Sequence, residues 1–157
     1  MIPDRVRSVL ERHGLEPHEF EPGSTPTSTK AAEKLGVSVG QIAKSLLFVT
    51  RDGRYAMVVL AGDRRVSNAR LKQLLGAKSR MASAEETLGI LGLPPGAVCP
   101  FGVDEIPLYI DASLAVHEAV YPAAGTDSSG VRTTYGQLLE ITGATPCDVC
   151  EPPASPA

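Results

Sequence analysis

Two apolar segments near the middle of the chain place the strongest constraint on its fold. Residues 45–50 and 55–61 are apolar at most positions and are separated by a short turn that contains Asp52 and Gly53. An Asp-Gly pair between two strand-forming segments is typical of a tight hairpin. Strands with one solvated face alternate apolar and polar residues, so two nearly continuous apolar strands predict a sheet covered on both faces.

Helical segments surround this predicted hairpin, and capping signals mark several of their ends. Further short strands are predicted at residues 106–110, 117–121 and 131–133. Because helices and strands are mixed without a regular βαβ alternation, we predict an α+β fold with helices around a mixed, partly closed, barrel-like sheet. The predicted helices cover residues 6–13, 29–35, 38–41, 68–75, 83–91 and 135–141.

The length of 157 residues predicts a single domain, which we place at residues 1–146, followed by a proline-rich tail over residues 147–157. No apolar run approaches the roughly 20 residues of a membrane span. Three cysteines, an odd number, in a chain without a recognisable signal peptide favour a reducing compartment. We therefore expect a cytoplasmic protein with no membrane partner.

Charge is distributed unevenly along the chain. The formal net charge is −3, yet residues 51–80 contain eight basic and two acidic residues, a local excess of +6. Such a patch can hold a phosphate backbone even in an acidic protein, although it can equally be a solvated helix face. Aromatic residues make up only 4% of the chain, which disfavours a stacking surface for single-stranded nucleic acid. We expect no DNA partner.

Lys44 stands between a helix-like stretch and a run of strand-forming residues. Burying an ammonium group there is unfavourable unless a partner compensates it. The position therefore makes Lys44 a candidate for binding an anion or for acting with a lowered pKa. Alternatively, its aliphatic stem packs on the protein and its charged end reaches water.

The segment 96–102 combines two glycines with Pro100. Glycine allows a backbone to approach a ligand closely, and consecutive backbone N–H groups in such a turn can bind an oxyanion or a carbonyl oxygen. A tight turn between a helix and a strand is the alternative, because Gly and Pro interrupt most loops.

Four segments together resemble the YbaK/EbsC family of aminoacyl-tRNA deacylases, which are free-standing relatives of the editing domain inserted in bacterial prolyl-tRNA synthetases. The resemblance covers about residues 25–145, and the segments occur in the family's order. They are residues 29–37, the lysine segment 41–48, the strand and helix over 58–72, and the loop 96–102.

This resemblance implies a trans-editing hydrolase that cleaves the ester between a wrong small amino acid (Ala, Ser, Cys or Thr) and the 3′ end of a tRNA. Lys44 matches the family's essential lysine, and Gly96 to Pro100 match the loop that meets the aminoacyl carbonyl. Water, assisted by a ribose hydroxyl of the substrate, would be the nucleophile, with no metal and no cofactor. Further substrate contacts are expected at Thr29, Ala97, Val98, Cys99, Gly102, Gly125, Thr126 and Asp127.

The acceptor stem of the tRNA would lie along the basic helix and the residues before it. The expected contacts are Arg64, Arg65, Arg70 and Lys72. An aminoacyl-tRNA synthetase is a further expected partner. A small pocket excludes large side chains but discriminates poorly between similar small ones, so the amino acid stays open among the four.

Residues 123–130 depart from the Gly-Lys-Arg-Gly-like turn of many relatives. The lost positive charge keeps open an alternative, a non-catalytic module that binds tRNA or a synthetase. A third hypothesis is a thiol-redox protein that uses Cys147 and Cys150. This pair lacks the two further ligands of a zinc site, and Cys99 has no activating base that the sequence identifies.

Overall fold

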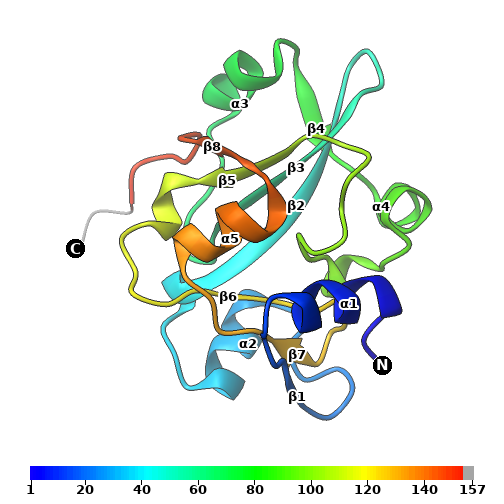
Figure 1. Cartoon of the computed structure of the whole chain (residues 1–157). Helices are drawn as coiled ribbons and strands as arrows, with labels where there is room; N and C mark the ends of the chain where they lie inside the picture. The colour runs from blue at the N-terminus through cyan, green and yellow to red at the C-terminus, as the bar shows by residue number, and fades with distance from the viewer. Residues whose placement is uncertain (154–157) are drawn as a thin grey trace.

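The computed structural model describes residues 1–153, and its centre is the predicted hairpin (Figure 1). Strand β2 (Ile42–Thr50) pairs antiparallel with β3 (Tyr55–Ala61), in a register that sets Lys44 opposite Leu60. Gly53, with φ of +86°, is in the turn between them, where a left-handed backbone conformation favours glycine.

The main sheet has the strand order β4-β2-β3-β5-β8, and β6 also pairs with β2. The added strands are short: β4 (Ser79–Met81), β5 (Leu108–Asp111), β6 (Tyr121–Pro122) and β8 (Thr145–Cys147). Pairing is antiparallel for β2 with β3 and β4 and parallel for β3-β5, β5-β8 and β2-β6. The predicted α+β fold with a mixed sheet is confirmed, and the sheet remains open.

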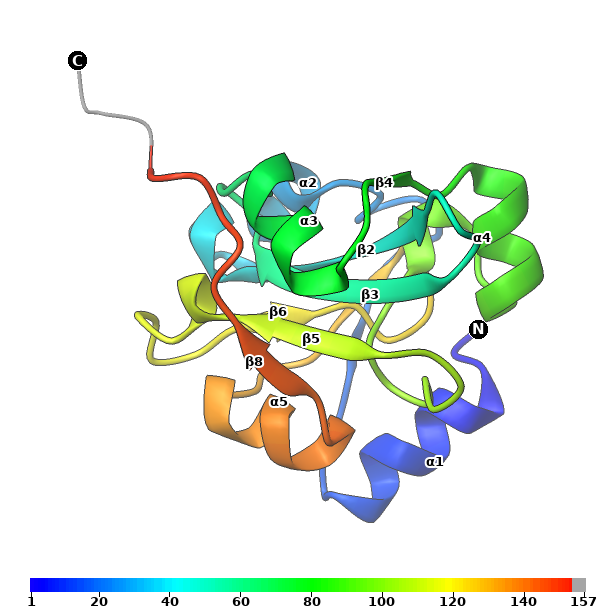
Figure 2. The same cartoon turned by 90° about the horizontal axis from the view of Figure 1, so that it is seen from above.

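Helices cover both faces of the sheet, as the apolar strands predicted (Figure 2). On one face, α1 (Asp4–Arg12) and α5 (Tyr135–Thr142) contribute to the main core with the odd-numbered side chains of β3. On the other face, α3 (Asn68–Leu75) packs on the even-numbered ones. Helix α2 (Ser28–Leu35) covers Ile42 at the start of β2.

The local signals for helix ends correspond to observed caps. Capping boxes begin α4 (Ala84–Leu91) at Ser83 and α5 at Thr134. A third box, at Ser38, begins a single 3₁₀ turn, η1 (Val39–Gln41), which leads directly into β2. These caps satisfy N–H groups that a helix start otherwise leaves unpaired, which explains why the sequence marks them so clearly.

The outer edge of β2 is covered only at its two ends. Strand β6 pairs with residues 42–43 and β4 with residues 48–50, which leaves Ser45 between them. Gly62 N–H donates to the Ile42 carbonyl (2.8 Å), which shows that even-numbered residues here bond to β3. Because bonding direction alternates along a strand, the N–H and C=O of Ser45 face this uncovered edge.

The C-terminal part of the chain differs from its prediction. The strand predicted at 117–121 is reduced to β6, preceded by an isolated bridge between Val120 and Thr133. A two-stranded sheet of β1 (His18–Glu19) and β7 (Ser129–Gly130) was not predicted.

No helix within residues 1–153 is long and apolar enough to cross a membrane.

The expected tail from residue 147 onward begins inside β8, and the chain stays packed for several residues beyond it. Val149 and Cys150 are each only 2% exposed. The packed body therefore extends past the expected boundary at residue 146. The last part of the expected tail, residues 154–157, lies outside the described residues.

Candidate active site

A cavity of about 190 Å³ lies at the uncovered edge of β2. Four parts of the chain line it: residues 25–28 with Ala31 and Leu35 of α2, residues 42–46 of β2, the loop residues Pro95, Gly96 and Val98, and the group Tyr121, Ala123 and Ser129. Lys44 and Gly96 thus share one cavity, although 52 positions separate them in the sequence (96 − 44). The strand edge and the two flanking loops create this juxtaposition.

Lys44 shares the face of β2 that carries α3, since its side chain alternates with those of Ala43 and Ser45. Its ammonium donates to the carbonyl oxygens of Arg64 (2.7 Å) and Gly62 (3.4 Å), in the segment that follows β3. A lysine ammonium has three N–H donors. Two are therefore used, and the third has no acceptor among residues 1–153.

Burial lowers the pKa of Lys44 below its ordinary 10.5. Cys150 and Asp63 act in the opposite direction, and the nearby Arg65 lowers the pKa further. A half-buried ammonium with its pKa moved toward neutrality is poorly hydrated and therefore interacts strongly with an anion. This electrostatic setting suits a group that meets developing negative charge.

The predicted carbonyl-binding loop contains a 3₁₀ turn, η2 (Pro95–Ala97). Its Ala97 N–H is used internally and donates to the Pro94 carbonyl (2.9 Å). Gly96 and Val98 line the cavity, whereas Pro100 is buried and does not line it. A Cβ placed on Gly96 would lie 3.6 Å from the Cβ of Asp127, so the loop approaches the 123–130 segment closely.

Ala97 and Cys99 point away from this cavity into the main core, with exposures of 2% and 0%. The Cys99 thiol donates to the Phe101 carbonyl at 3.9 Å, and burial raises its pKa to about 11. A protonated, buried thiol is a weak nucleophile. The structure thus gives these two expected substrate contacts a packing role.

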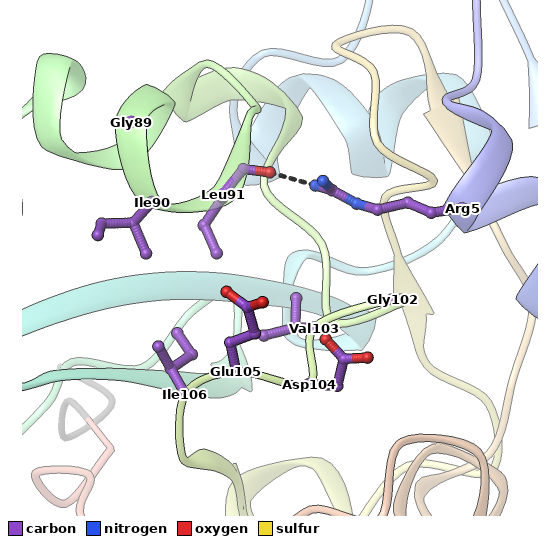
Figure 3. A pocket seen from close by; sticks show the side chains of 9 residues that line it. All are labelled: Arg5, Gly89, Ile90, Leu91, Gly102, Val103, Asp104, Glu105 and Ile106. Carbon is purple, nitrogen blue, oxygen red and sulfur yellow. Dashed lines mark hydrogen bonds between the residues drawn. The ribbon is translucent and has the colours of Figure 1, made fainter.

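Gly102 lines a different cavity, of about 400 Å³ (Figure 3). There the guanidinium of Arg5 donates to the Leu91 carbonyl, and Asp104 and Glu105 contribute to the wall. A Cβ on Gly102 would lie 3.2 Å from Cγ of Arg5. The predicted substrate contact at Gly102 is therefore separated from Lys44.

The other predicted substrate contacts surround the cavity without lining it. Thr29 is exposed on α2, one residue beyond Ser28, which does line it. Gly125 lies against α1, where an added Cβ would be 2.9 Å from Pro3. Thr126 donates to the Ser129 hydroxyl (2.8 Å), and the Asp127 side chain accepts from Gly23 N–H (3.1 Å). Thr126 and Asp127 thus brace the wall that Ser129 completes.

The four predicted tRNA contacts divide into two pairs. Arg64 donates from Nη2 to the Glu151 carbonyl (2.7 Å), and Arg70 contacts Asp148 (3.4 Å) and the Cys150 carbonyl (3.2 Å). The exposed side chains of Arg65 and Lys72 make no hydrogen bond or ion pair within residues 1–153 and remain the freer candidates for phosphate.

Cys147 and Cys150 surround the buried carboxylate of Asp111. One Asp111 oxygen lies 3.8 Å from the Cys147 sulfur and accepts from Val149 N–H (2.7 Å). Burial, followed by the Asp111 charge, raises the pKa of Cys147 to about 12, and burial is the largest cause for the same value at Cys150. Thiols held protonated do not favour the redox hypothesis. Residues 1–153 contain no group of three or more His, Cys, Asp or Glu side chains arranged for a metal.

Sequence analysis missed several cavity residues, above all Ser45. Its hydroxyl is the one buried side-chain oxygen or nitrogen in the described chain that has no hydrogen-bond partner. Buried hydroxyl groups are nearly always paired, so a ligand or an ordered water in the cavity would supply the partner of this one. Its place directly after Lys44 was the available clue, whereas nothing in the sequence marked Thr25 or Tyr121.

Fold and cavity together define a class: an α+β domain in which a half-buried lysine and a glycine-containing turn share a small cavity at a strand edge. A family model described as an aminoacyl-tRNA editing domain matches residues 23–141. A crystal structure of a proposed trans-editing enzyme for prolyl-tRNA synthetase superposes with a TM-score of 0.84 at 33% identity, covering 97% of this chain and 100% of that one. That of the hypothetical protein APE2540 gives 0.86 at 30% identity, covering 94% and 100%.

Sequence relatives agree with this match. The Bacillus subtilis protein YwhH is 40% identical over 125 residues, which is 79% of each chain. The proline–tRNA ligase of Shouchella clausii is 34% identical over 140 residues, which is 85% of this chain and 24% of the ligase. The chain thus spans about a quarter of the length of that ligase. It belongs to the aminoacyl-tRNA editing domain family.

Proposed function

We propose that this protein is a trans-editing hydrolase that releases a wrongly attached small amino acid from the 3′ end of a tRNA. The observation that carries the proposal is the shared cavity of Lys44 and Gly96. Hydrolysis of the ester consumes one water and yields the free amino acid and a tRNA with a free ribose hydroxyl. The relatedness to proline–tRNA ligases makes tRNA(Pro) the first tRNA to test.

Cavity size supports a small amino acid. Pockets for drug-sized ligands have volumes of about 300–1,000 Å³. A cavity of about 190 Å³ has room for an aminoacyl group, while the terminal nucleotide would lie at its mouth. Ala, Ser, Cys and Thr fit this limit, and steric exclusion alone separates them poorly from one another.

Lys44 supplies the positive charge for the reaction. The ester carbonyl gains negative charge as water attacks, and a fixed cation in a poorly hydrated site stabilises that charge better than water does. Its free N–H can meet a phosphate or ester oxygen of the substrate. The start of α2 at Ser28, with the positive end of its helix dipole, adds to the same potential.

Backbone N–H groups at Gly96 and Val98 are the proposed donors to the aminoacyl carbonyl. Gly96 keeps this wall free of a side chain, and the buried Pro100 restricts the backbone of the same loop. The nucleophile is water, activated by a hydroxyl of the substrate's own ribose. A protein nucleophile is not needed, in keeping with the buried, protonated state of Cys99.

A non-catalytic module that binds tRNA or a synthetase is the second candidate. The 123–130 segment favours it, because this segment lacks the basic residues of many relatives and yet braces the cavity wall through Asp127. Such a module would bind aminoacyl-tRNA through the same edge of β2 without turning it over.

The deciding experiment is a deacylation assay on tRNA(Pro) charged with Ala, Ser, Cys or Thr, with Pro-tRNA(Pro) as the cognate control. We expect hydrolysis of at least one mischarged tRNA and protection of the cognate one. Lys44→Ala should lower kcat/KM by about 10²-fold or more, the size of effect seen when one oxyanion-stabilising group is removed. Lys44→Arg, which keeps the charge, should retain part of the activity.

Binding without turnover of any substrate would establish the second candidate. Hydrolysis by Lys44→Ala at the wild-type rate would refute the assigned role of this lysine. A thermal melt of each variant serves as the folding control.

A further inference from the structure

Residues 147–151, here called the C-terminal strap, are bound to the segment that follows β3. Glu151 N–H donates to the Arg65 carbonyl and Ser67 N–H to the Val149 carbonyl, both at 2.7 Å. Val66 and Cys150 form an antiparallel bridge between these bonds. In Figure 2 the strap, drawn in red, leaves β8 and crosses toward the side of the sheet that carries α3.

Arg64 connects this strap to the active-site lysine. Its side chain donates from Nε (3.3 Å) and Nη2 (2.7 Å) to one oxygen, the Glu151 carbonyl. Its own carbonyl oxygen accepts the Lys44 ammonium at 2.7 Å, and its N–H donates to the Ala61 carbonyl at 3.0 Å. Arg64, whose carbonyl holds Lys44, is therefore fixed through its N–H to β3 and through its side chain to the strap.

The strap is itself anchored to a buried charge. Asp111 is fully buried and accepts Val149 N–H (2.7 Å) on one oxygen and Ser113 N–H (2.9 Å) on the other. Burial alone would raise the pKa of Asp111, but these hydrogen bonds, with that of Cys150, lower it overall. The carboxylate stays ionised near neutral pH and holds the strap in place.

We propose that Arg64 is a positioning residue for Lys44, held by the C-terminal strap, and not a tRNA ligand. This inference rests on the proposed function of Lys44. A guanidinium has five N–H groups, and the two that Arg64 donates to the Glu151 carbonyl hold its side chain against the strap. A lysine side chain is highly flexible, so the carbonyl of Arg64 limits where the ammonium can go.

Misplacement of a catalytic group by about 1 Å can reduce a rate by as much as 10²-fold. Loss of the Arg64 side chain removes its contact with the strap, while the Arg64 N–H bond to the Ala61 carbonyl and the Glu151 N–H bond to the Arg65 carbonyl remain. We therefore expect Arg64→Ala to lower kcat by about 10-fold, which is less than the 10²-fold effect of full misplacement, and to leave KM nearly unchanged.

The neighbouring Arg65 provides a matched comparison. It is exposed and makes no side-chain hydrogen bond or ion pair within residues 1–153. If it meets a phosphate, Arg65→Ala raises KM and reduces the slope of log affinity against log salt by about 1, while kcat stays close to wild type. Two adjacent arginines thus give opposite kinetic signatures.

The test measures kcat and KM separately at 50 and 200 mM salt, on the best mischarged tRNA, for wild type, Arg64→Ala, Arg64→Lys and Arg65→Ala. Arg64→Lys keeps the charge but lacks the planar guanidinium that reaches the Glu151 carbonyl through two N–H groups, so it should recover kcat only in part. A raised KM and a reduced salt slope for Arg64→Ala, with wild-type values for Arg64→Lys, would show that Arg64 is a phosphate ligand and overturn the proposal.

A second measurement does not depend on turnover. The side-chain ¹⁵N signal of Lys44, assigned through Lys44→Arg, should show slowed proton exchange in the wild type and lose it in Arg64→Ala. An unchanged Lys44 signal in Arg64→Ala would overturn the positioning role even if no substrate were hydrolysed. Absence of wild-type turnover with a changed signal would instead count against the proposed function alone.

Discussion

Two of the cavities in the molecule are lined by residues of the loop 96–102, and the smaller of these two contains the polar groups that lack partners. In the larger cavity, of about 400 Å³, the Arg5 guanidinium is paired with the Leu91 carbonyl and the acidic wall is solvated. The smaller one, of about 190 Å³, combines the half-buried ammonium of Lys44, an uncovered strand edge and the unpaired hydroxyl of Ser45. Unpaired polar groups at low hydration, more than volume, mark a site prepared for a ligand.

Two glycines of the loop test this comparison most directly. Gly96→Ala should fold normally, because the new Cβ meets only ordinary contacts at 3.6 Å or more and the backbone of Gly96 is not left-handed. The methyl group narrows the small cavity beside the proposed carbonyl donors. We expect kcat/KM for deacylation to fall by about 10- to 100-fold, within the range for a disturbed oxyanion site, at an unchanged melting temperature.

Gly102→Ala should have the reverse effect. Gly102 has φ of +75°, and its added Cβ would crowd Arg5 at 3.2 Å. Strain of this kind destabilises a fold by about 1–3 kcal/mol, while each folded molecule should retain its activity. Urea denaturation and initial rates measure the two effects separately. If Gly96→Ala and Gly102→Ala lost the same share of activity per folded molecule, the proposed functional difference between the two cavities would be wrong.

The pH dependence should follow the smaller cavity. Because burial lowers the pKa of Lys44, its ammonium loses a proton at a lower pH than an ordinary lysine, whose pKa is 10.5. Enzymatic kcat/KM, corrected for spontaneous ester hydrolysis, should decline as pH rises through the lowered pKa. In Lys44→Arg the decline should be absent, because a guanidinium does not titrate in this range.

The same shift affects stability with a defined sign. The pKa of Lys44 is 10.5 in the unfolded chain and lower in the folded protein. At a pH between these two values, the unfolded chain binds more protons than the folded one. The contribution of Lys44 therefore makes the free energy of unfolding rise with pH in that window. Urea denaturation of wild type and Lys44→Arg across the window measures the difference, and a contribution that falls with pH would contradict the burial of this ammonium.

What the sequence could predict was local in origin. The Asp52-Gly53 hairpin and the caps at Ser83 and Thr134 depend on neighbouring residues, and each is found where it was expected. Lys44 and Gly96 were likewise identified from the residues around them, helped by the resemblance to a family. Their common cavity, however, arises from the pairing of β4 and β6 along β2, which no short segment encodes.

The predictions that differ from the structure concern long-range contacts. Residues 147–151 resemble a tail by composition, yet the buried Asp111 and the backbone of residues 65–67 bind them. The charge of Arg64 is visible in the sequence, whereas the backbone carbonyl of Glu151 that accepts from its side chain is not. Successive residues of the loop also point in different directions, so that Cys99 is buried in the core and Val98 lines the cavity.

Ser45 gives the smallest and most selective test of the comparison. Removing a buried hydroxyl that lacks a partner relieves a desolvation penalty, so Ser45→Ala should leave the free energy of unfolding unchanged or raise it by up to about 1 kcal/mol. If the hydroxyl binds the aminoacyl group, KM should rise several-fold. Thr87→Val is the matched control, because the Thr87 hydroxyl is partnered with the Ser83 carbonyl (2.8 Å) outside the cavity.

The control should lose about 1 kcal/mol of stability, the usual net value of such a bond, and keep its KM. A loss of stability in Ser45→Ala as large as that in Thr87→Val would mean that the Ser45 hydroxyl already has a partner in the free protein, such as an ordered water. The cavity would then contain one ligand-directed group fewer, and the contrast with the Arg5 cavity would depend on Lys44 and the open strand edge alone.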